Sequence, residues 1–419
     1  MRKGRRSHRR YSQRRQSAPR APKAVPYWKW LLHWVKALFV RKPKVLGQVI
    51  PFDKYPEPDL EFIPPLFSRF PELLGRIPWV SLRGTQDPSV PKKISRAQHY
   101  FGSNHTYLKR ESRDVDLISE TSAKKLEFIL GRALQTNPTK IYVFDSSSSS
   151  HLLALSQAAS LLKKKIAFFL LDDGANSPSD TDLRSIQELG AKIKYFRSAF
   201  FWNLWKKVLQ IFDSKHSVFL PLEDSEVLSA LAYVSSLVEI ETFHSKGQMP
   251  IPDFVFVPVE TGAVIAGMEV ARRVLGLSQL TLIGISTHDR DEASPERLAE
   301  ICNQTIELLN ENLGTPVKER VKAQDFIIID SSPKNRDLEE MQRWTSRFLE
   351  LEGVELDIHS TAPAIFESAK YLEREKIENR VVLFWKTYSG SRTFDLGTGH
   401  VVEIDYGVRR QKRFSRSPQ

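Results

Sequence analysis

The spacing of apolar residues alternates between two periods along residues 116–171. Apolar positions first recur at helical spacing, then form a continuous run rich in β-branched and aromatic residues, and then repeat both patterns after a polar turn. The segments are a helix at 123–134, a strand at 141–145, a helix at 152–162 and a strand at 166–171. This order predicts a parallel α/β unit.

The same alternation continues toward the C-terminus. The pattern predicts further strands at 192–196, 217–221, 280–286, 325–330, 355–358 and 380–384, one that begins at Asp253, and helices at 182–188, 295–309, 336–352 and 362–373. Strands that alternate with helices indicate an α/β fold with doubly wound parallel sheets. Ligands of such sheets bind beyond the carboxyl ends of the strands, so the serine run at 146–150 lies where a small-molecule site is expected.

The charge of the chain is concentrated at its ends. The 419 residues, 41% of them hydrophobic, are enough for two or three domains with a large core. Residues 1–45 contain fifteen Lys and Arg and no acidic residue, and residues 407–419 contain five more. Without these twenty, 42 of the 62 basic residues remain against 50 acidic ones, so the body carries about −8 of the overall +12.

The N-terminal 45 residues have two parts. Residues 1–24 are Arg-rich and have too few apolar residues to offset chain entropy, which predicts a disordered tail. This tail is solvated, binds nucleic acid or anionic lipid, or acts as a targeting segment. Residues 26–42 predict an amphipathic helix with Trp28, Trp30 and Trp34. This helix either lies in a membrane interface or docks on the body or a second subunit. Residues 43–65 are Pro-rich and predict a linker.

The remaining composition narrows the class of protein. Cys302 is the only cysteine, so it cannot form an internal disulfide, which fits a reducing compartment. The histidines lack metal-ligand spacing, and no apolar run is long enough for a transmembrane helix. We expect a cytoplasmic protein without a metal site, with peripheral membrane attachment as the alternative.

Residues 119–127 and 145–151 resemble two motifs of the 1-aminocyclopropane-1-carboxylate deaminase and D-cysteine desulfhydrase family, which uses pyridoxal phosphate. The family motif Gly-Gly-Asn-Lys-Thr-Arg-Lys-Leu-Glu ends on Lys125-Leu126-Glu127, which places Ser122 where the family has its Schiff-base lysine. Lys124 and Lys125 follow, but they are rotated by roughly 200° and 300° around a helix, so neither replaces that lysine. The family turn Gly-Gly-Ile-Gln-Ser-Asn-His leaves its serine at Ser149 and its histidine at His151.

Two more segments carry the resemblance. The family's phosphate-binding turn, Thr-Gly-Ser-Gly-Gly-Thr, falls on Val-Glu-Thr-Gly-Ala-Val at 259–264, where Glu260 would repel a phosphate by about 4 kcal/mol at about 4 Å. The family's Asp-Pro-Val-Tyr-Thr-Gly-Lys falls on residues 385–391 and keeps a tyrosine at its substrate-pocket position. The resemblance implies catalytic positions at Ser122, Ser149 and Tyr388, and cofactor contacts at Ser150, Thr261, Gly262, Ala263, Val264 and Ser389. A hydroxyl such as that of Ser149 before a helix is more often an N-cap.

The resemblance implies a tryptophan-synthase-β-like fold of type II, which is also expected to form a homodimer. The small α/β domain is expected at 123–222, the large one at 46–122 and 223–406, and the basic tails at 1–45 and 407–419. Three functions remain open. The first is a catalytically degenerate homologue that binds a small amino acid or anion. The second is an active pyridoxal-phosphate deaminase or lyase with a relocated lysine, and the third is a protein that binds a membrane surface or nucleic acid through its basic tails.

Overall fold

The computed structural model describes the body of the chain between residues 63 and 403. The described ranges are 63–82, 89–111, 114–115, 118–147, 149, 151–172, 180–221, 224–259, 261–287, 294–314, 317–331, 337–357, 360–387, 392–394 and 401–403. The chain divides into two units, 1–47 and 48–419, and all described residues belong to the second. The predicted tails, the amphipathic helix at 26–42 and the linker up to residue 62 lie outside the described residues.

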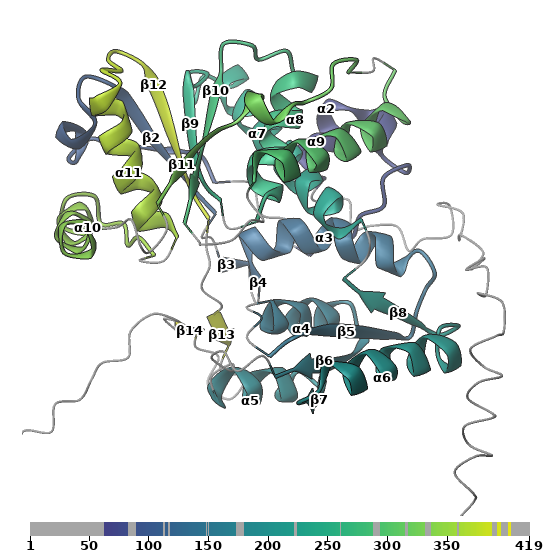
Figure 1. The fold of residues 1–419 in the computed structure, drawn as a ribbon. Helices are drawn as coiled ribbons and strands as arrows, with labels where there is room; N and C mark the ends of the chain where they lie inside the picture. The colour runs from purple at the N-terminus through teal and green to yellow at the C-terminus, as the bar shows by residue number, and fades with distance from the viewer. Residues whose placement is uncertain are drawn as a thin grey trace, which may run out of the picture. The chain divides into compact units, whose positions relative to one another are not determined.

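Six strands form the larger sheet, in the order β1-β2-β12-β9-β10-β11 (Figure 1). Their bounds are β1 (Lys92–Lys93), β2 (His105–Arg110), β9 (Phe254–Val259), β10 (Thr281–Ser286), β11 (Ile327–Asp330) and β12 (Val381–Lys386). Strand β1 pairs antiparallel with β2, and every other pair is parallel. The carboxyl ends of the five parallel strands therefore lie at one edge of this sheet.

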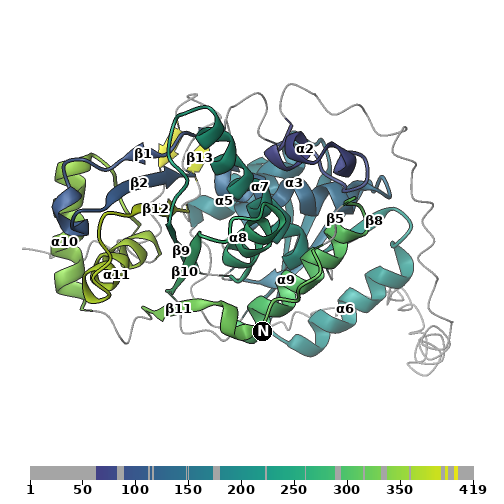
Figure 2. The ribbon, with the colours of Figure 1, turned by 90° about the horizontal axis from the view of Figure 1, so that it is seen from above.

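Helices cover both faces of the six-stranded sheet, as Figure 2 shows. One group contains α7 (Ser225–Ser245), α8 (Ala263–Val274) and α9 (Pro295–Asn310), and the other contains α10 (Leu338–Glu352) and α11 (Thr361–Arg374). Residues of β9 alternate between them, because Val255 and Val257 join the first core and Phe256 joins the second. This is the alternation of a strand buried on both faces.

Four parallel strands form the smaller sheet, in the order β7-β6-β5-β8. They are β5 (Lys140–Ser146), β6 (Lys165–Leu171), β7 (Lys192–Phe196) and β8 (Ser217–Leu220). Side chains of α3 (Glu120–Leu134), α4 (Leu152–Leu161) and α5 (Asp180–Glu188) share a core with one face, and α6 (Ala199–Phe212) packs on Phe144 and Phe169 of the other. All four strands fall inside the range 123–222 predicted for the small domain, although the domain boundaries stay a prediction.

Shorter elements complete the described chain. They are α2 (Pro65–Arg69), η2 (Pro71–Leu73), η3 (Gln98–Phe101), β3 (Asp114–Val115), β4 (Ile118–Ser119), η5 (Ala323–Asp325), β13 (Arg392–Phe394) and β14 (Val401–Glu403). Within the part of the chain that the structure describes, no helix is both long and apolar enough to span a bilayer.

The predicted α/β fold with parallel sheets is confirmed, and β7 has the predicted bounds. The strand predicted at 355–358 is wrong for its described residues, because 353–357 have no regular structure. Val354 and Leu356 are buried at alternate positions, which resembles a strand, but they fill the core beside α10 and α11 without pairing to the sheet. Helices α6 and α7 were not predicted. Helix α7 is buried on nearly every side, so it has no one-sided apolar stripe.

Gly267 allows α7 and α8 to pack at very short distance. A Cβ atom at this position would lie 2.1 Å from the carbonyl oxygen of Ala230 and 2.8 Å from Cβ of Tyr233. Both contacts are far shorter than van der Waals distances. The backbone of α8 therefore lies where only glycine fits, and this contact fixes the distance between the two helices that carry the larger core.

We predict that Gly267→Ala lowers the free energy of unfolding by about 1–3 kcal/mol, because the added methyl group forces two buried helices apart. Urea denaturation measures this change. Gly314→Ala is the matched control, because a Cβ there meets open space. Equal unfolding midpoints for the two variants would contradict the close packing.

Glu352, in the last turn of α10, binds the start of a distant segment. Its Oε1 accepts backbone N–H bonds from Ser95, Arg96 and Ala97 at 3.0, 2.7 and 2.8 Å. Burial raises the pKa of Glu352. The three N–H groups and Lys92 together lower this pKa by more than burial raises it, so the net pKa lies below the ordinary 4.5. The carboxylate is thus stabilised in its charged form by the folded chain.

Because its pKa is lower in the folded state, Glu352 contributes stability at every pH above about 4.5, and this contribution is lost as the pH falls through the lower folded-state pKa. We predict that Glu352→Gln reduces the free energy of unfolding at pH 7 and that the difference from wild type shrinks at acid pH. Urea denaturation across pH measures both. A difference that does not depend on pH would argue against the charged carboxylate as its cause.

Candidate functional site

The start of α3 contains the position that the family resemblance assigns to a cofactor-binding lysine. Ser119 is the N-cap of α3, and its hydroxyl accepts a hydrogen bond from the Ser122 backbone N–H at 3.3 Å. The Ser119 hydroxyl also donates to the Ser122 hydroxyl at 3.0 Å. The side chain of Ser122 therefore takes part in the capping of its own helix.

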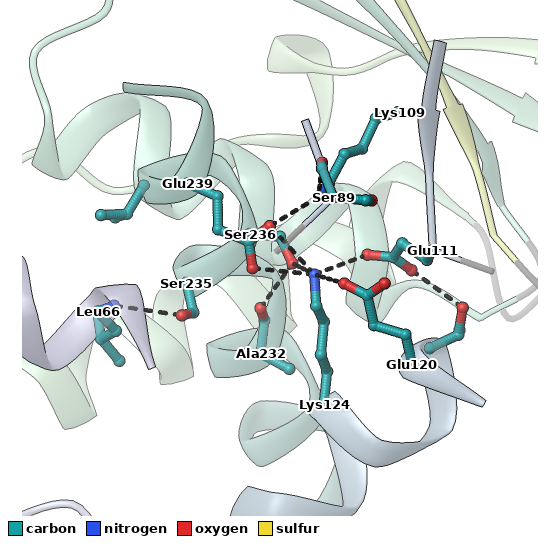
Figure 3. Close-up of polar contacts among 12 residues, drawn as sticks. Leu66, Ser89, Lys109, Glu111, Glu120, Lys124, Ala232, Ser235, Ser236 and Glu239 are labelled. Atoms are coloured by element: carbon teal, nitrogen blue, oxygen red, sulfur yellow. Dashed lines mark hydrogen bonds and ion pairs between the residues drawn. The ribbon is translucent and has the colours of Figure 1, made fainter. Parts of the chain in front are cut away.

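Lys124 projects from the next part of α3 into a group of carboxylates (Figure 3). Its Nζ lies 3.0 Å from Oε1 of Glu239, 3.2 Å from Oε1 of Glu120 and 3.3 Å from Oε1 of Glu111. It also donates to the hydroxyl of Ser236 at 3.2 Å. Lys124 is only 2% exposed, so three carboxylates hold its ammonium group in the interior.

A second buried lysine extends this network. Lys109 Nζ, on β2, lies 3.0 Å from Oε2 of Glu239 and donates to the carbonyl oxygen of Ser89 at 2.7 Å. The ammonium group also lies over the rings of Phe243 and Trp385, at 5.4 and 6.0 Å from their centroids. Glu239 therefore bridges one lysine from β2 and one from α3.

The five charged residues of this network, Lys109, Glu111, Glu120, Lys124 and Glu239, are each at most 4% exposed. Three carboxylates face two ammonium groups. Thr121 contributes a further hydrogen bond by donating to Oε2 of Glu111 at 3.1 Å. Charges taken out of water are stable only when their partners and hydrogen bonds stay in place, so this network strongly couples β2, α3 and α7.

Lys125 lies apart from the carboxylate group. Its Nζ is 5.7 Å from the ring centroid of Tyr233 on α7, an arrangement typical of a cation–π contact. The two adjacent lysines of α3 thus both contact α7. Lys124 binds the carboxylate of Glu239, and Lys125 lies over the ring of Tyr233.

The turn that follows β5 holds Ser149. The Ser149 hydroxyl accepts a hydrogen bond from the backbone N–H of His151 at 3.4 Å, and the Ser149 N–H donates to the carbonyl oxygen of Ser146 at 3.3 Å. The expected N-cap role of the serine run is wrong for the described residues, since the N-cap of α4 is His151 and no side chain caps it. The described bonds of Ser149 are local, within the turn.

The turn between β9 and α8 holds four of the predicted cofactor contacts. Thr261 is half-buried, and Gly262 is the N-cap of α8, without a side-chain cap. The side chains of Ala263 and Val264 are each 3% exposed. Their backbone N–H groups belong to the first turn of α8, where helix geometry provides no acceptor. These groups are the donors that this turn can offer to an anion.

The described residues cover only part of the predicted site. Tyr388, Ser389, Ser150 and Glu260 lie outside them. The chain is described up to the end of β12, where Lys386 and Thr387 are buried at 7% and 6% exposed.

The sequence analysis missed the buried charged network. Two signals could have indicated it, namely Lys109 within the apolar strand around Leu108 and the spacing of four residues between Glu120 and Lys124. Burial raises the pKa of the Cys302 thiol well above 9.0, so this residue is not a reactive nucleophile. In the described ranges, no group of three or more side chains has the arrangement of a metal site.

Comparison with known proteins gives matches over most of the chain. Residues 91–387 match the model of a family described as pyridoxal-phosphate dependent enzyme. A protein of Pyrococcus abyssi (strain GE5 / Orsay) that is named for 1-aminocyclopropane-1-carboxylate deaminase is 23% identical over 246 residues, which are 58% of this chain and 72% of that protein.

One solved structure shows that the fold is shared, and a second one matches more weakly. The crystal structure of a 1-aminocyclopropane-1-carboxylate deaminase homologue matches with a TM-score of 0.59 and 18% identity, over 78% of this chain and 95% of the other. A fungal L-serine ammonia-lyase from Rhizomucor miehei matches with a TM-score of 0.49 and 14% identity, over 71% and 92%. Because the family model covers more than half of the sequence, the chain belongs to the pyridoxal-phosphate dependent enzyme family.

Proposed function

We propose that this chain is a non-catalytic member of its family, in which the start of α3 is a structural junction and no longer a covalent attachment point for the cofactor. The observation that carries the proposal is the pair of roles on α3. Ser122 has no amine, and its hydroxyl bonds to the helix cap. Lys124, the nearest buried amine, is held by three carboxylates.

The described residues fit pyridoxal phosphate only in part. When bound, this cofactor acts as an electron sink for substrates that join its aldehyde, and the enzyme holds it through a lysine amine. The first N–H groups of α8 suit a phosphate, but Ser122 cannot form the covalent bond. We therefore derive no reaction step through the cofactor.

A small anion or amino acid is the ligand class that we propose for the carboxyl edge of the six-stranded sheet. The N–H groups of Ala263 and Val264 would receive its negative group without covalent attachment. Ser149 follows the carboxyl end of β5, and Tyr388 and Ser389 follow that of β12, so they are the side chains that we propose for contact with the rest of the ligand.

A relocated lysine is the second candidate function, and one observation favours it. Lys386 is the last residue of β12, is 7% exposed and precedes the predicted pocket residue Tyr388 by two positions. Strand alternation, however, places Lys386 on the same side as Val382 and Phe384, which join the α11 core, whereas α8 packs on the other side. This placement makes the non-catalytic function the first choice.

Cofactor binding to the purified protein distinguishes the two functions. We predict that added pyridoxal phosphate gives no visible absorbance of a lysine-bound cofactor and that borohydride fixes no cofactor on any peptide. A reduced adduct that maps to a single lysine by mass spectrometry would contradict the non-catalytic proposal. An adduct on Lys386 that disappears in Lys386→Arg would establish the relocated lysine.

The structural role of Lys124 predicts a large stability effect. Lys124→Met leaves three buried carboxylates without their shared ammonium group, so we expect the free energy of unfolding to fall by about 3–5 kcal/mol. Lys125→Met is the matched control, because Lys125 is the adjacent lysine of the same helix, is half-buried and makes a cation–π contact with Tyr233. Urea denaturation measures both, and equal losses would contradict the role of the carboxylate group.

A further inference from the structure

Helix α6 has an apolar side that is wider than its contact with the sheet. On the inner side, Trp202 and Leu209 pack on the four-stranded sheet, and the Trp202 indole N–H donates to the carbonyl oxygen of Phe169 at 2.8 Å. A surface helix needs only one apolar side to attach to its sheet. The remaining apolar residues of α6 therefore need a separate explanation.

The outer side of α6 is exposed and rich in aromatic residues. Successive residues of a helix are rotated by 100°, so the exposed apolar side chains of α6 fall within an arc of about 140° that does not include Trp202. They are Phe200 at 70% exposed, Phe201 at 60%, Trp205 at 36%, Ile211 at 49% and Phe212 at 70%. They are five of the twelve exposed large hydrophobic residues in the described ranges.

These five residues, Phe200, Phe201, Trp205, Ile211 and Phe212, are called the α6 surface below. Such a concentration within 13 positions of the chain differs from the single exposed apolar residues that most protein surfaces carry. A concentration of exposed aromatic residues of this kind marks a surface that binds a partner.

The chain around the α6 surface is strongly basic. Residues 189–216 contain six Lys and Arg and a single acidic residue, Asp213, which leaves a formal charge of +5. Asp213 is already paired with Lys140, whose Nζ lies 2.8 Å from its Oδ2. Lys194 Nζ lies 3.7 Å from the ring centroid of Trp205, so a cationic group contacts an aromatic ring of this surface. Lys192, Lys194, Arg197, Lys207 and Lys215 are exposed.

We propose that the α6 surface binds the interface of a bilayer that contains anionic lipids, with the axis of α6 in the plane of the membrane. Exposed Phe and Trp side chains insert at the boundary between headgroups and acyl chains, and nearby Lys and Arg are attracted to anionic headgroups. The Phe-rich outer side and the net positive charge of α6 supply both requirements. This proposal does not depend on the proposed function.

Charge argues against two other occupants of the surface. A second copy related by a two-fold axis would bring the same cationic segment against itself, and like charges across an interface oppose association. Residues 1–45 of this chain carry fifteen Lys and Arg and no acid, so they are repelled in the same way. An anionic lipid surface is complementary to the segment in two ways, because its acyl chains match the apolar side chains and its negative headgroups match the positive charge.

Vesicle flotation of the full chain tests the proposal. The protein is mixed with vesicles of phosphatidylcholine alone or with added phosphatidylserine, for wild type and for Phe200→Ser/Phe201→Ser/Phe212→Ser. We expect wild type to bind the vesicles with phosphatidylserine, less strongly as salt is raised, and the triple variant to bind more than about tenfold more weakly. The substituted side chains are exposed, and thermal unfolding verifies that the variant stays folded.

Two full-length controls separate the α6 surface from other features. Leu338→Ser/Leu349→Ser changes exposed apolar residues on α10 and should bind as wild type does. Trp28→Ser/Trp30→Ser/Trp34→Ser changes the N-terminal segment. With these substitutions, vesicle binding should still be weakened by the triple substitution on α6. Equal binding of wild type and the α6 triple variant, or no binding by wild type, would overturn the proposal. So would sedimentation that shows a dimer broken by the triple variant without vesicle binding.

Discussion

The contact between Glu239 and two lysines is the interaction on which the arrangement of this molecule depends. One ammonium group comes from β2 of the six-stranded sheet and the other from α3, which packs on the four-stranded sheet. Attraction between unit charges is much stronger in a protein interior than in water, and an unpaired buried charge is very costly. The position of α3 against α7 is therefore held by electrostatics as well as by the apolar contacts around Phe128.

The same network also holds the first turns of α3. In this protein, the start of the helix is held by a serine cap and the next turn by carboxylates. Neither arrangement requires a ligand, since every charge in the network has a partner from the chain itself.

The fold could be predicted from sequence in segments whose apolar pattern fits only one type of secondary structure. The strands at 192–196 and 281–286 are short apolar runs between turns, and such runs have few alternatives. The error at 355–358 arose because alternating burial of Val354 and Leu356 is also possible in an irregular segment. The candidate site was less predictable. Ser122 could be placed by its motif, and Glu120 lies four residues before its partner Lys124. The other two carboxylates come from residues 111 and 239, and no local pattern indicates contacts that distant in sequence.

The shared carboxylate of Glu239 also restricts how this protein can evolve. Replacing Lys109, Lys124 or Glu239 alone would strand an opposite charge in the interior, so single substitutions would be removed by selection for folding. Changes at these positions are tolerated only when two or more occur together, for example a lysine and a carboxylate both replaced by apolar residues.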